Sequence, residues 1–392
     1  MTARDRSTGA PSDELRAGFA NALTRRRLLT IAGGGLVLAA CSGNDAKSAD
    51  TTGTAAVSAP ASVPATPATT TSSSTSTTSS TTTTTLPPTT TLPPPVQPLT
   101  GLPLDDEALL ARVALVVKIS NDPGARPQTG LNEPDIIFEA WGAGPTRFAT
   151  VWHSRDQDFV GPIRSCREQD VNLVGSFNGA VFACSGGNPG NIALLRDSDL
   201  LLVTEGQGPG WQLDPRRSRP HKTHANTLLL RSNGLDRTGP PQQYHYRAVG
   251  EAATAGEAMT GFDLQMQQVS IAWRYDPGTG TYLRDQSGRA HLLTDGQQVT
   301  TENVVIAWTN YQRSSTDGRS PNGDTTGTNP VHVFTGGQMI TGTWTRNDRL
   351  EPFAWNDESG APIALTPGRT FVELANGGGG SFTGSDAFTA VP

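Results

Sequence analysis

A long tract of Ser, Thr and Pro limits which part of this 392-residue chain can form a core. Residues 51–100 contain no charged residue, and most of them are Thr, Ser or Pro. Such a composition buries too little apolar surface to offset the entropy lost on folding. We therefore predict a disordered linker over residues 41–97 and a folded part of roughly 290 residues, which is enough for one large or two smaller domains.

An export signal precedes this linker. Arg25 and Arg26 resemble a twin-arginine pattern, and the apolar run that follows is too short and too Gly-rich to span a bilayer stably. Residues 38–41 read Leu-Ala-Ala-Cys, which resembles a lipobox, although an ordinary signal with a chance Cys would look similar. We predict a signal peptide over residues 1–40 and two acyl chains on Cys41, which suffice for stable membrane anchoring. The protein would then lie on the outer, extracytoplasmic face of the cell membrane.

The charge distribution argues against nucleic acid as a partner. The formal net charge is −6, and residues 1–40 carry six Arg against three Asp plus Glu, so the rest of the chain carries −9. Nucleic-acid binding requires a net basic surface or a strong basic stripe. Lys occurs only at Lys47, Lys118 and Lys222, so nearly all positive charge is Arg, which suits bidentate anion recognition. A codon preference for Arg would produce the same bias.

The apolar pattern predicts an α+β chain with two units. In residues 98–240, strand-like runs cover residues 113–119, 135–141, 146–152, 179–184 and 200–203. Helices are predicted from Ser165 to residue 177, over residues 188–195 and from Thr223 to residue 230. This unit therefore appears as mixed α/β. Residues 241–392 form a β-rich unit, with strands over residues 269–275, 281–284, 303–311, 331–334, 339–346 and 369–374 and a hairpin turn at residues 276–280.

Standard catalytic and metal-binding signatures are mostly absent. Ser185 lacks the Gly two positions earlier that a nucleophile elbow requires. His221 and His224 are three residues apart, but no third ligand stands at a recognisable spacing. We therefore predict no metal and no cofactor, and whether the chain is an enzyme stays open.

Polar residues gather where the predicted strands of residues 98–240 end, and binding sites usually lie in such loops. The sequence of residues 185–188 also leads into a predicted helix, whose free N–H groups can hold an anion. This group predicts a site for a phosphate or carboxylate, and its candidate ligand-binding residues are Asn121, Arg126, Gln128, Arg147, Arg164, Arg167, Ser185, Gly186, Gly187 and Arg219. The alternative is that these Arg side chains pair with carboxylates and only stabilise loops.

A catalytic alternative uses carboxylates from the same region. Glu139 and Asp170 can form an acid/base pair, with His221 as a further candidate. If these groups share one cleft, a cell-wall-active hydrolase or transferase is favoured. If they are instead buried in salt bridges with Arg147 and Arg164, the catalytic hypothesis fails. A broad exposed apolar patch without a polar cleft would instead indicate a structural or assembly protein.

Cys166 and Cys184 are the only thiols that follow Cys41. Outside the cytoplasm such a pair predicts a disulfide that closes a loop of about 18 residues and contributes roughly 3 kcal/mol. The alternative is that Cys184 acts as a nucleophile with a His base.

Many of these residues together resemble the YerB-like bacterial lipoproteins, a family described as domain of unknown function 3048. The resemblance extends from residue 98 to near the end of the chain, and the segments that carry it are residues 98–103, Asn121, 126–130, Asp135, Glu139, 146–148, 161–165, Arg167, Asp170, 185–187, 282–284, 303–304, 342–344 and 367–368. It implies an α/β-type unit, a β-rich unit and a lipid anchor, but no established reaction.

Two positions depart from the family pattern. Cys166 and Cys184 stand where the family has small or aromatic residues, which favours a local disulfide in this chain. Lys222 follows His221 where the family has Asn, which puts in doubt any role shared by that pair.

The primary hypothesis is an envelope lipoprotein that binds an anionic or glycan ligand, or a protein partner, through the polar residues of the first unit.

Overall fold

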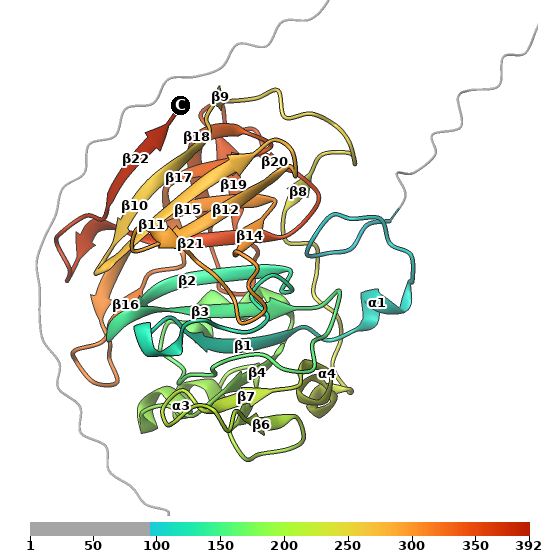
Figure 1. Ribbon diagram of the computed structural model, residues 1–392, viewed down its shortest axis with the longest axis vertical. Helices are drawn as coiled ribbons and strands as arrows, with labels where there is room; N and C mark the ends of the chain where they lie inside the picture. Colours follow the sequence, from blue (N-terminus) through green and yellow to red (C-terminus); the bar gives the residue numbers. More distant parts are fainter. Residues whose placement is uncertain (1–94) are drawn as a thin grey trace, which may run out of the picture. The chain divides into compact units, whose positions relative to one another are not determined.

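A computed structural model describes residues 95–392 of the chain (Figure 1). The predicted export signal with Arg25 and Arg26, the predicted anchor Cys41 and nearly all of the predicted linker lie outside the described residues. Within residues 95–392, no helix has both the length and the apolar character that crossing a membrane requires.

One mixed sheet of twelve strands runs through most of the described chain. Its main path follows the order β19-β18-β17-β15-β21-β2-β3-β1-β4-β5. The strands from the first half of the described chain are β1 (Leu115–Ser120), β2 (Ile136–Gly142), β3 (Gly144–Trp152), β4 (Val181–Cys184) and β5 (Leu201–Thr204). Those from the second half are β15 (Asn303–Arg313), β17 (Gly327–Thr335), β18 (Gln338–Arg346), β19 (Ala354–Asp357) and β21 (Thr370–Gly380), with β9 (Glu257–Ala258) and β16 (Pro321–Gly323) off the path.

The two halves of the chain meet inside this sheet. Strand β21 lies between β15 and β2 and runs parallel to both. Every residue of β1 and β2 is buried, which explains their continuous apolar runs, because strands covered on both faces need not alternate. The predicted boundary near residue 240 separates strands that share one sheet, and the division into two units stays a prediction.

A second sheet of six strands packs on one face of the first. It contains β10 (Gly261–Met266), β11 (Val269–Asp276), β12 (Thr281–Gln286), β13 (Arg289–Ala290), β14 (Thr300–Thr301) and β22 (Ala387–Val391). The predicted hairpin at residues 276–280 is confirmed, since Asp276 pairs with Thr281. Trp273 of β11 lies edge-on to Phe371 of β21, with ring centroids 5.0 Å apart, so the two sheets share a core.

The helices are few and short. They are α1 (Ala108–Ala111), α2 (Asp170–Leu173), α3 (Pro189–Arg196) and α4 (Thr227–Arg231), with 3-10 turns η1 (Pro123–Ala125), η2 (Gly175–Phe177) and η3 (Ser232–Gly234). The helix predicted over residues 188–195 is confirmed as α3, and Asn188 caps it by accepting a hydrogen bond from the Asn191 amide. The described chain is thus β-rich, and the mixed α/β character of residues 98–240 stays a prediction.

Two predicted helix starts are wrong for the same physical reason. Residues 164–166 bond to neighbouring segments, because the Arg164 amide donates to the Lys118 carbonyl and the Cys166 amide to the Gly186 carbonyl. Helix α2 consequently begins only at Asp170. Thr223 begins strand β7 (Thr223–Ala225), which pairs with β6 (Trp211–Leu213), and Asn226 caps α4 instead. The remaining two-stranded sheet pairs β8 (His245–Tyr246) with β20 (Ala364–Leu365).

Candidate functional site

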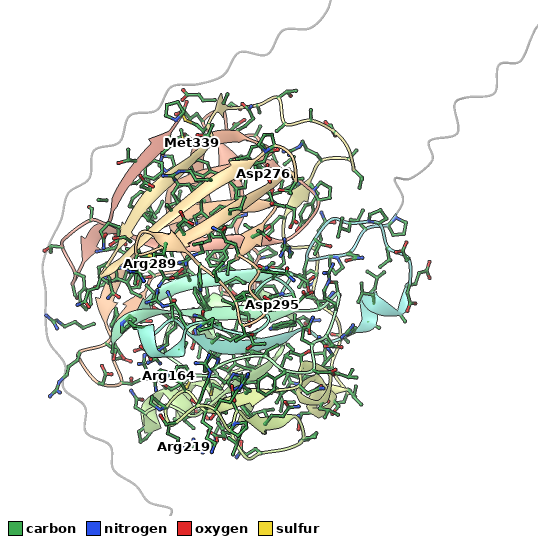
Figure 2. All side chains as sticks on the ribbon, viewed as in Figure 1. Arg164, Arg219, Asp276, Arg289, Asp295 and Met339 are labelled. Carbon is green, nitrogen blue, oxygen red and sulfur yellow. The ribbon has the colours of Figure 1, made fainter. Side chains whose placement is uncertain are left out.

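The loop of residues 161–168 brings most of the predicted ligand-binding residues to one edge of the large sheet. The Ser120 amide donates to the Pro162 carbonyl, which holds this loop beside the end of β1. On the other side, the Ser185 amide donates to the Arg164 carbonyl, which holds it beside the end of β4. Arg164, which belongs to this loop, is labelled in the lower half of Figure 2.

Three Arg side chains gather at this loop, and we call Arg147, Arg164 and Arg167 the arginine cluster. One Nη of Arg147 donates to the Ser165 carbonyl at 2.9 Å and to its hydroxyl at 2.8 Å. Arg167 donates to the carbonyl of Cys166 at 3.2 Å and approaches the Ser165 hydroxyl at 3.5 Å. The predicted gathering of these three Arg side chains is therefore present in the structure.

The arginine cluster contains more positive than negative charge. Asp122 accepts two hydrogen bonds from Arg164, at 2.9 and 3.1 Å. Asp170 is fully buried and forms an ion pair at 2.8 Å with the buried Lys118 ammonium. Among residues 95–392, neither Arg147 nor Arg167 has a carboxylate within ion-pair distance. Four cationic side chains thus lie near two carboxylates that each pair directly with only one of them, and the charge of a third, Asp317, acts on Arg167 without an ion-pair contact.

Burial makes this excess charge costly for Arg147. Its residue is only 7% exposed, and burial together with the charges of Arg167 and Arg164 lowers its pKa to about 9. Burial likewise lowers the pKa of Arg167, whose Nε has no hydrogen-bond partner within the described part of the chain. An anion beside these groups would relieve both the desolvation and the mutual repulsion.

Cys166 and Cys184 are buried free thiols that contact each other behind the arginine cluster. Gly187 lies against the Cys166 sulfur, and a Cβ at this position would be only 2.5 Å from that atom. A glycine is therefore required there by the close approach. The structure brings together the two thiols predicted to pair, and the disulfide itself stays a prediction.

Several predicted residues point inward and join a fully buried polar network. Asn121 donates to Glu139 at 2.9 Å, and Gln128 donates to the Ser120 carbonyl at 2.9 Å. Arg284 of β12 donates to the other Glu139 oxygen at 2.6 Å. We call this set the buried network, and its members are Asn121, Gln128, Glu139, Thr146, Arg284, Gln286, His291 and Glu373.

The charges of the buried network balance. Glu139 and Glu373 are opposite each other across the parallel pair β2 and β21, and both are fully buried. Burial and the nearby Glu139 raise the pKa of Glu373 well above its usual value, which keeps it protonated. Burial and Arg284 hold the pKa of His291 well below its usual value, so this imidazole is neutral and accepts from Arg284 at 2.6 Å. One cation, Arg284, thus faces one carboxylate, Glu139.

The three catalytic candidates do not share a cleft. Glu139 lies in the buried network, Asp170 is paired with Lys118, and neither carboxylate is exposed. His221 lies elsewhere, against Gly124 in a surface cleft. Within residues 95–392, no group of three or more His, Cys, Asp or Glu side chains is arranged to hold a metal ion.

The remaining predicted ligand-binding residues lie at the rim of the arginine cluster. Arg219 is 66% exposed and forms a two-pronged ion pair with Glu205 at 2.8 and 3.1 Å, so it follows the loop-stabilising alternative. Ser185 and Gly186 are half-buried beside the arginine cluster, and Gly187 is exposed. The Asn188 side chain already caps the N-terminus of α3, which leaves fewer free N–H groups there for an anion than predicted.

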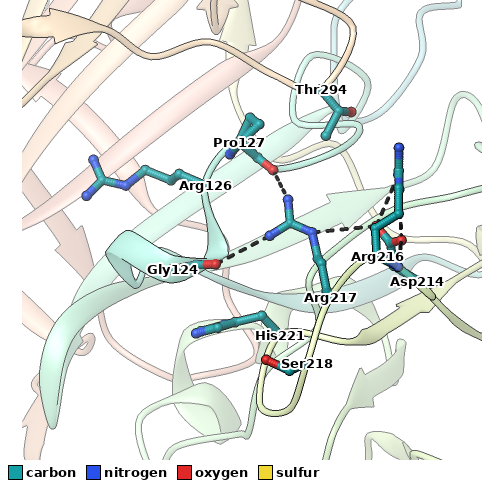
Figure 3. Close-up of a pocket in the computed structure, with 9 residues that line it drawn as sticks. All are labelled: Gly124, Arg126, Pro127, Asp214, Arg216, Arg217, Ser218, His221 and Thr294. Carbon is teal, nitrogen blue, oxygen red and sulfur yellow. Dashed lines mark hydrogen bonds and ion pairs between the residues drawn. The ribbon is translucent and has the colours of Figure 1, made fainter.

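A cleft of about 550 Å³ opens beside this region, and we call it the outer cleft (Figure 3). Arg126 and His221 were expected near a site, whereas five other polar lining residues were not: Asp214, Arg216, Arg217, Ser218 and Thr294. The run Arg216-Arg217-Ser218 was a usable sequence signal. No such signal marks Thr294, because this residue belongs to the other half of the chain. Its amide reaches the cleft by donating to the Gln128 carbonyl at 2.9 Å.

The fold and this polar edge define a β-rich protein with an arginine-lined surface site. Two family models match the chain, the N-terminal domain of the proteins of unknown function DUF3048 over residues 99–240 and the corresponding C-terminal domain over residues 262–372. The chain therefore belongs to the DUF3048 family.

A curated relative and a solved structure point to the same family. A Bacillus subtilis (strain 168) protein named "Putative lipoprotein YerB" is 26% identical over 291 residues, which is 71% of this chain and 85% of that protein. The crystal structure of Bacillus subtilis YerB matches with a TM-score of 0.64 at 21% identity, over 75% of this chain and 99% of that one. At this identity the structural match establishes a shared fold.

Proposed function

We propose that this chain is an exported, lipid-anchored protein that binds an anionic ligand of the cell envelope through its arginine cluster. The anchoring part rests on the Leu-Ala-Ala-Cys sequence that ends at Cys41, on the paired Arg25 and Arg26, and on the name of the Bacillus subtilis relative, which describes it as a lipoprotein. Acidic glycans and acidic protein segments both present carboxylate or phosphate oxygens, which are the chemistry that guanidinium groups recognise.

The observation that carries the binding proposal is that buried Arg147 has no direct carboxylate partner among residues 95–392 and only the more distant charges of Asp122 and Asp170. This guanidinium is buried beside two further Arg side chains, and its only hydrogen-bond acceptors among residues 95–392 belong to Ser165. A buried charge without a counter-charge costs several kcal/mol unless a ligand supplies the partner. The neighbouring residues Arg164, Ser165 and Arg167 are half-buried and therefore partly accessible to a ligand.

Calorimetric titration of the full chain with inorganic phosphate tests the binding proposal. Wild-type protein should bind phosphate, and both Arg147→Met and Arg167→Met should weaken binding at least tenfold, since each removes one guanidinium. Arg289→Met is the matched control, because Arg289 is an exposed arginine of β13 in the six-stranded sheet. Equal affinity in all four proteins would refute the arginine cluster as the site.

Membrane anchoring has a separate test. Cys41→Ser removes the thiol that the lipid would modify, so the variant should leave the membrane fraction and appear in the soluble extracytoplasmic fraction. Retention of Cys41→Ser in the membrane fraction would contradict lipid attachment at this residue.

We also propose that Cys166 and Cys184 form a disulfide once the protein is outside the cytoplasm. The two thiols are already in contact, and a bond between them would tie the loop of the arginine cluster to β4. Alkylation of denatured protein isolated from the envelope should then modify neither thiol unless a reductant is added. Modification of both thiols without reductant would show that the pair stays reduced.

A further inference from the structure

The outer cleft contains hydrogen-bonding groups that the protein itself leaves unused. Among residues 95–392, the Arg126 side chain makes no hydrogen bond and no ion pair, and its buried Nε has no partner. The Nδ1 atom of His221 is also buried without a partner. Both residues line the same cleft, and buried polar atoms of this kind are usually satisfied by a ligand or ordered water.

The floor of the outer cleft is rigid and positively charged. Arg217 donates to the carbonyls of Gly124, Ala125 and Pro127, at 3.4, 3.1 and 2.5 Å, and so fastens the loop that carries Arg126. Asp214 accepts two hydrogen bonds from Arg216, at 3.0 and 3.1 Å. Asp214 thus has two guanidinium partners, Arg216 and Arg217, whereas Arg126 extends away from it in Figure 3 and feels the charges of Arg284 and Glu139 instead.

The size and lining of the cleft indicate what it would hold. A volume of about 550 Å³ is far larger than a single oxyanion needs and lies in the range of small-molecule sites. Ser218 and Thr294 each bring a hydroxyl group to the cleft, on opposite sides of Arg217 in Figure 3, and Pro127 is the one apolar side chain among the lining residues described. Such walls favour a ligand with both a negative charge and several hydroxyl groups.

We infer that the outer cleft is a second binding site, which takes an acidic sugar, with the carboxylate or phosphate at Arg126 and the hydroxyl groups toward Ser218 and Thr294. Arg126, from the loop after β1, supplies charge-assisted hydrogen bonds. His221 supplies one further ring nitrogen. Thr294, from the second half of the chain, closes the cleft through its hydroxyl contact with Thr129 at 3.0 Å. This inference does not depend on the arginine cluster.

Calorimetric titration of the full chain with glucuronate, glucose 6-phosphate, glucose and inorganic phosphate tests the inference. Glucuronate and glucose 6-phosphate should bind, and glucose should bind at least tenfold more weakly because it lacks the anion. Binding of only one of the two acids would identify carboxylate or phosphate as the preferred group. Binding of glucose as tightly as of both acids, or no binding of either acid, would overturn the inference.

Variants locate the binding and separate it from the proposed function. Arg126→Met should weaken binding of the acidic sugars at least tenfold without unfolding the protein, since Arg126 makes no internal side-chain bond. Ser218→Ala should weaken it a few-fold, and Arg289→Met, the matched control labelled in Figure 2, should leave it within twofold of wild type. Arg147→Met should also leave it unchanged, so loss in that variant alone would assign the sugar to the arginine cluster and overturn the second site.

Inorganic phosphate is the last control. If the hydroxyl groups of Ser218 and Thr294 contribute to binding, glucose 6-phosphate should bind more tightly than phosphate to the Arg147→Met protein, in which the outer cleft is the intact site. Equal affinities for these two probes in that protein would contradict the sugar part of the inference. Unchanged sugar affinity in Arg126→Met would contradict the anion part.

Discussion

The arginine cluster and the buried network use the same residue types and differ in how their charges are matched. In the buried network, Arg284 faces one carboxylate, Glu139, while Glu373 and His291 are neutral. In the arginine cluster, Arg147 is nearly as buried but has no carboxylate partner among residues 95–392. The buried network, the matched set, has its charges paired within the protein and needs no ligand. The arginine cluster, the unmatched set, has Arg side chains without carboxylate partners in the described part of the chain, which favours binding of an anion.

The largest expected effect comes from removing the cation of the matched set. Arg284→Met would leave the Glu139 carboxylate buried without its partner, so the free energy of unfolding should fall by about 3–5 kcal/mol. Urea unfolding of the full chain measures it. The double variant Glu139→Gln, Arg284→Met should recover much of the loss. A loss below about 1 kcal/mol in Arg284→Met would end the comparison, because the network would then not depend on its charge balance.

The pH dependence of the unfolding free energy also tests the buried network. Burial and Arg284 depress the pKa of His291, so the unfolded chain binds a proton more readily than the folded protein does. The stability that neutral His291 contributes is present above about pH 6.5 and is lost as the pH falls. His291→Gln keeps a donor and an acceptor but does not titrate, so its unfolding free energy should decline less than that of wild type between about pH 7 and pH 5. Parallel pH curves would rule out this role.

A smaller effect is expected on the unmatched side. Arg147→Met removes two hydrogen bonds to Ser165 but also removes repulsion from Arg164 and Arg167. The two effects oppose each other, so the free energy of unfolding in phosphate-free buffer should change by no more than about 1 kcal/mol. A loss as large as that of Arg284→Met would make Arg147 a structural residue.

An exposed ion pair provides the lower limit of the series. Arg155 is 54% exposed and lies 3.3 Å from Glu133. Arg155→Ala should lower the free energy of unfolding by less than about 1 kcal/mol, because solvent and salt screen such pairs. A larger change would mean that surface charges also contribute to the differences measured for the two buried sets.

The sequence predicted local features better than long-range ones. The apolar runs located most strands of the large sheet because buried strands leave a continuous signal, as at residues 113–119. The pairing of β21 with β2 has no local signature. The helix start at Ser165 was misplaced because the backbone of residues 164–166 bonds to Lys118 and Gly186 instead.

The sequence predicted which residue types form the candidate site, but not which of their side chains point to the surface and which point into the core. Arg147, Arg164 and Arg167 gather as expected, but Asn121 and Gln128 from the same polar group turn inward. Their partners Gln286 and His291 lie more than 160 residues further along the chain, so spacing alone could not separate a surface group from a core group.

The position of β21 sets the order in which this protein can reach its final form. Because β21 fills the gap between β2 and β15, the first half of the sheet lacks its central neighbour until residues near the end of the chain have been synthesised. Until then β2 exposes an unpaired edge, which invites association with other chains. A chain truncated before residue 370 should therefore accumulate as aggregates.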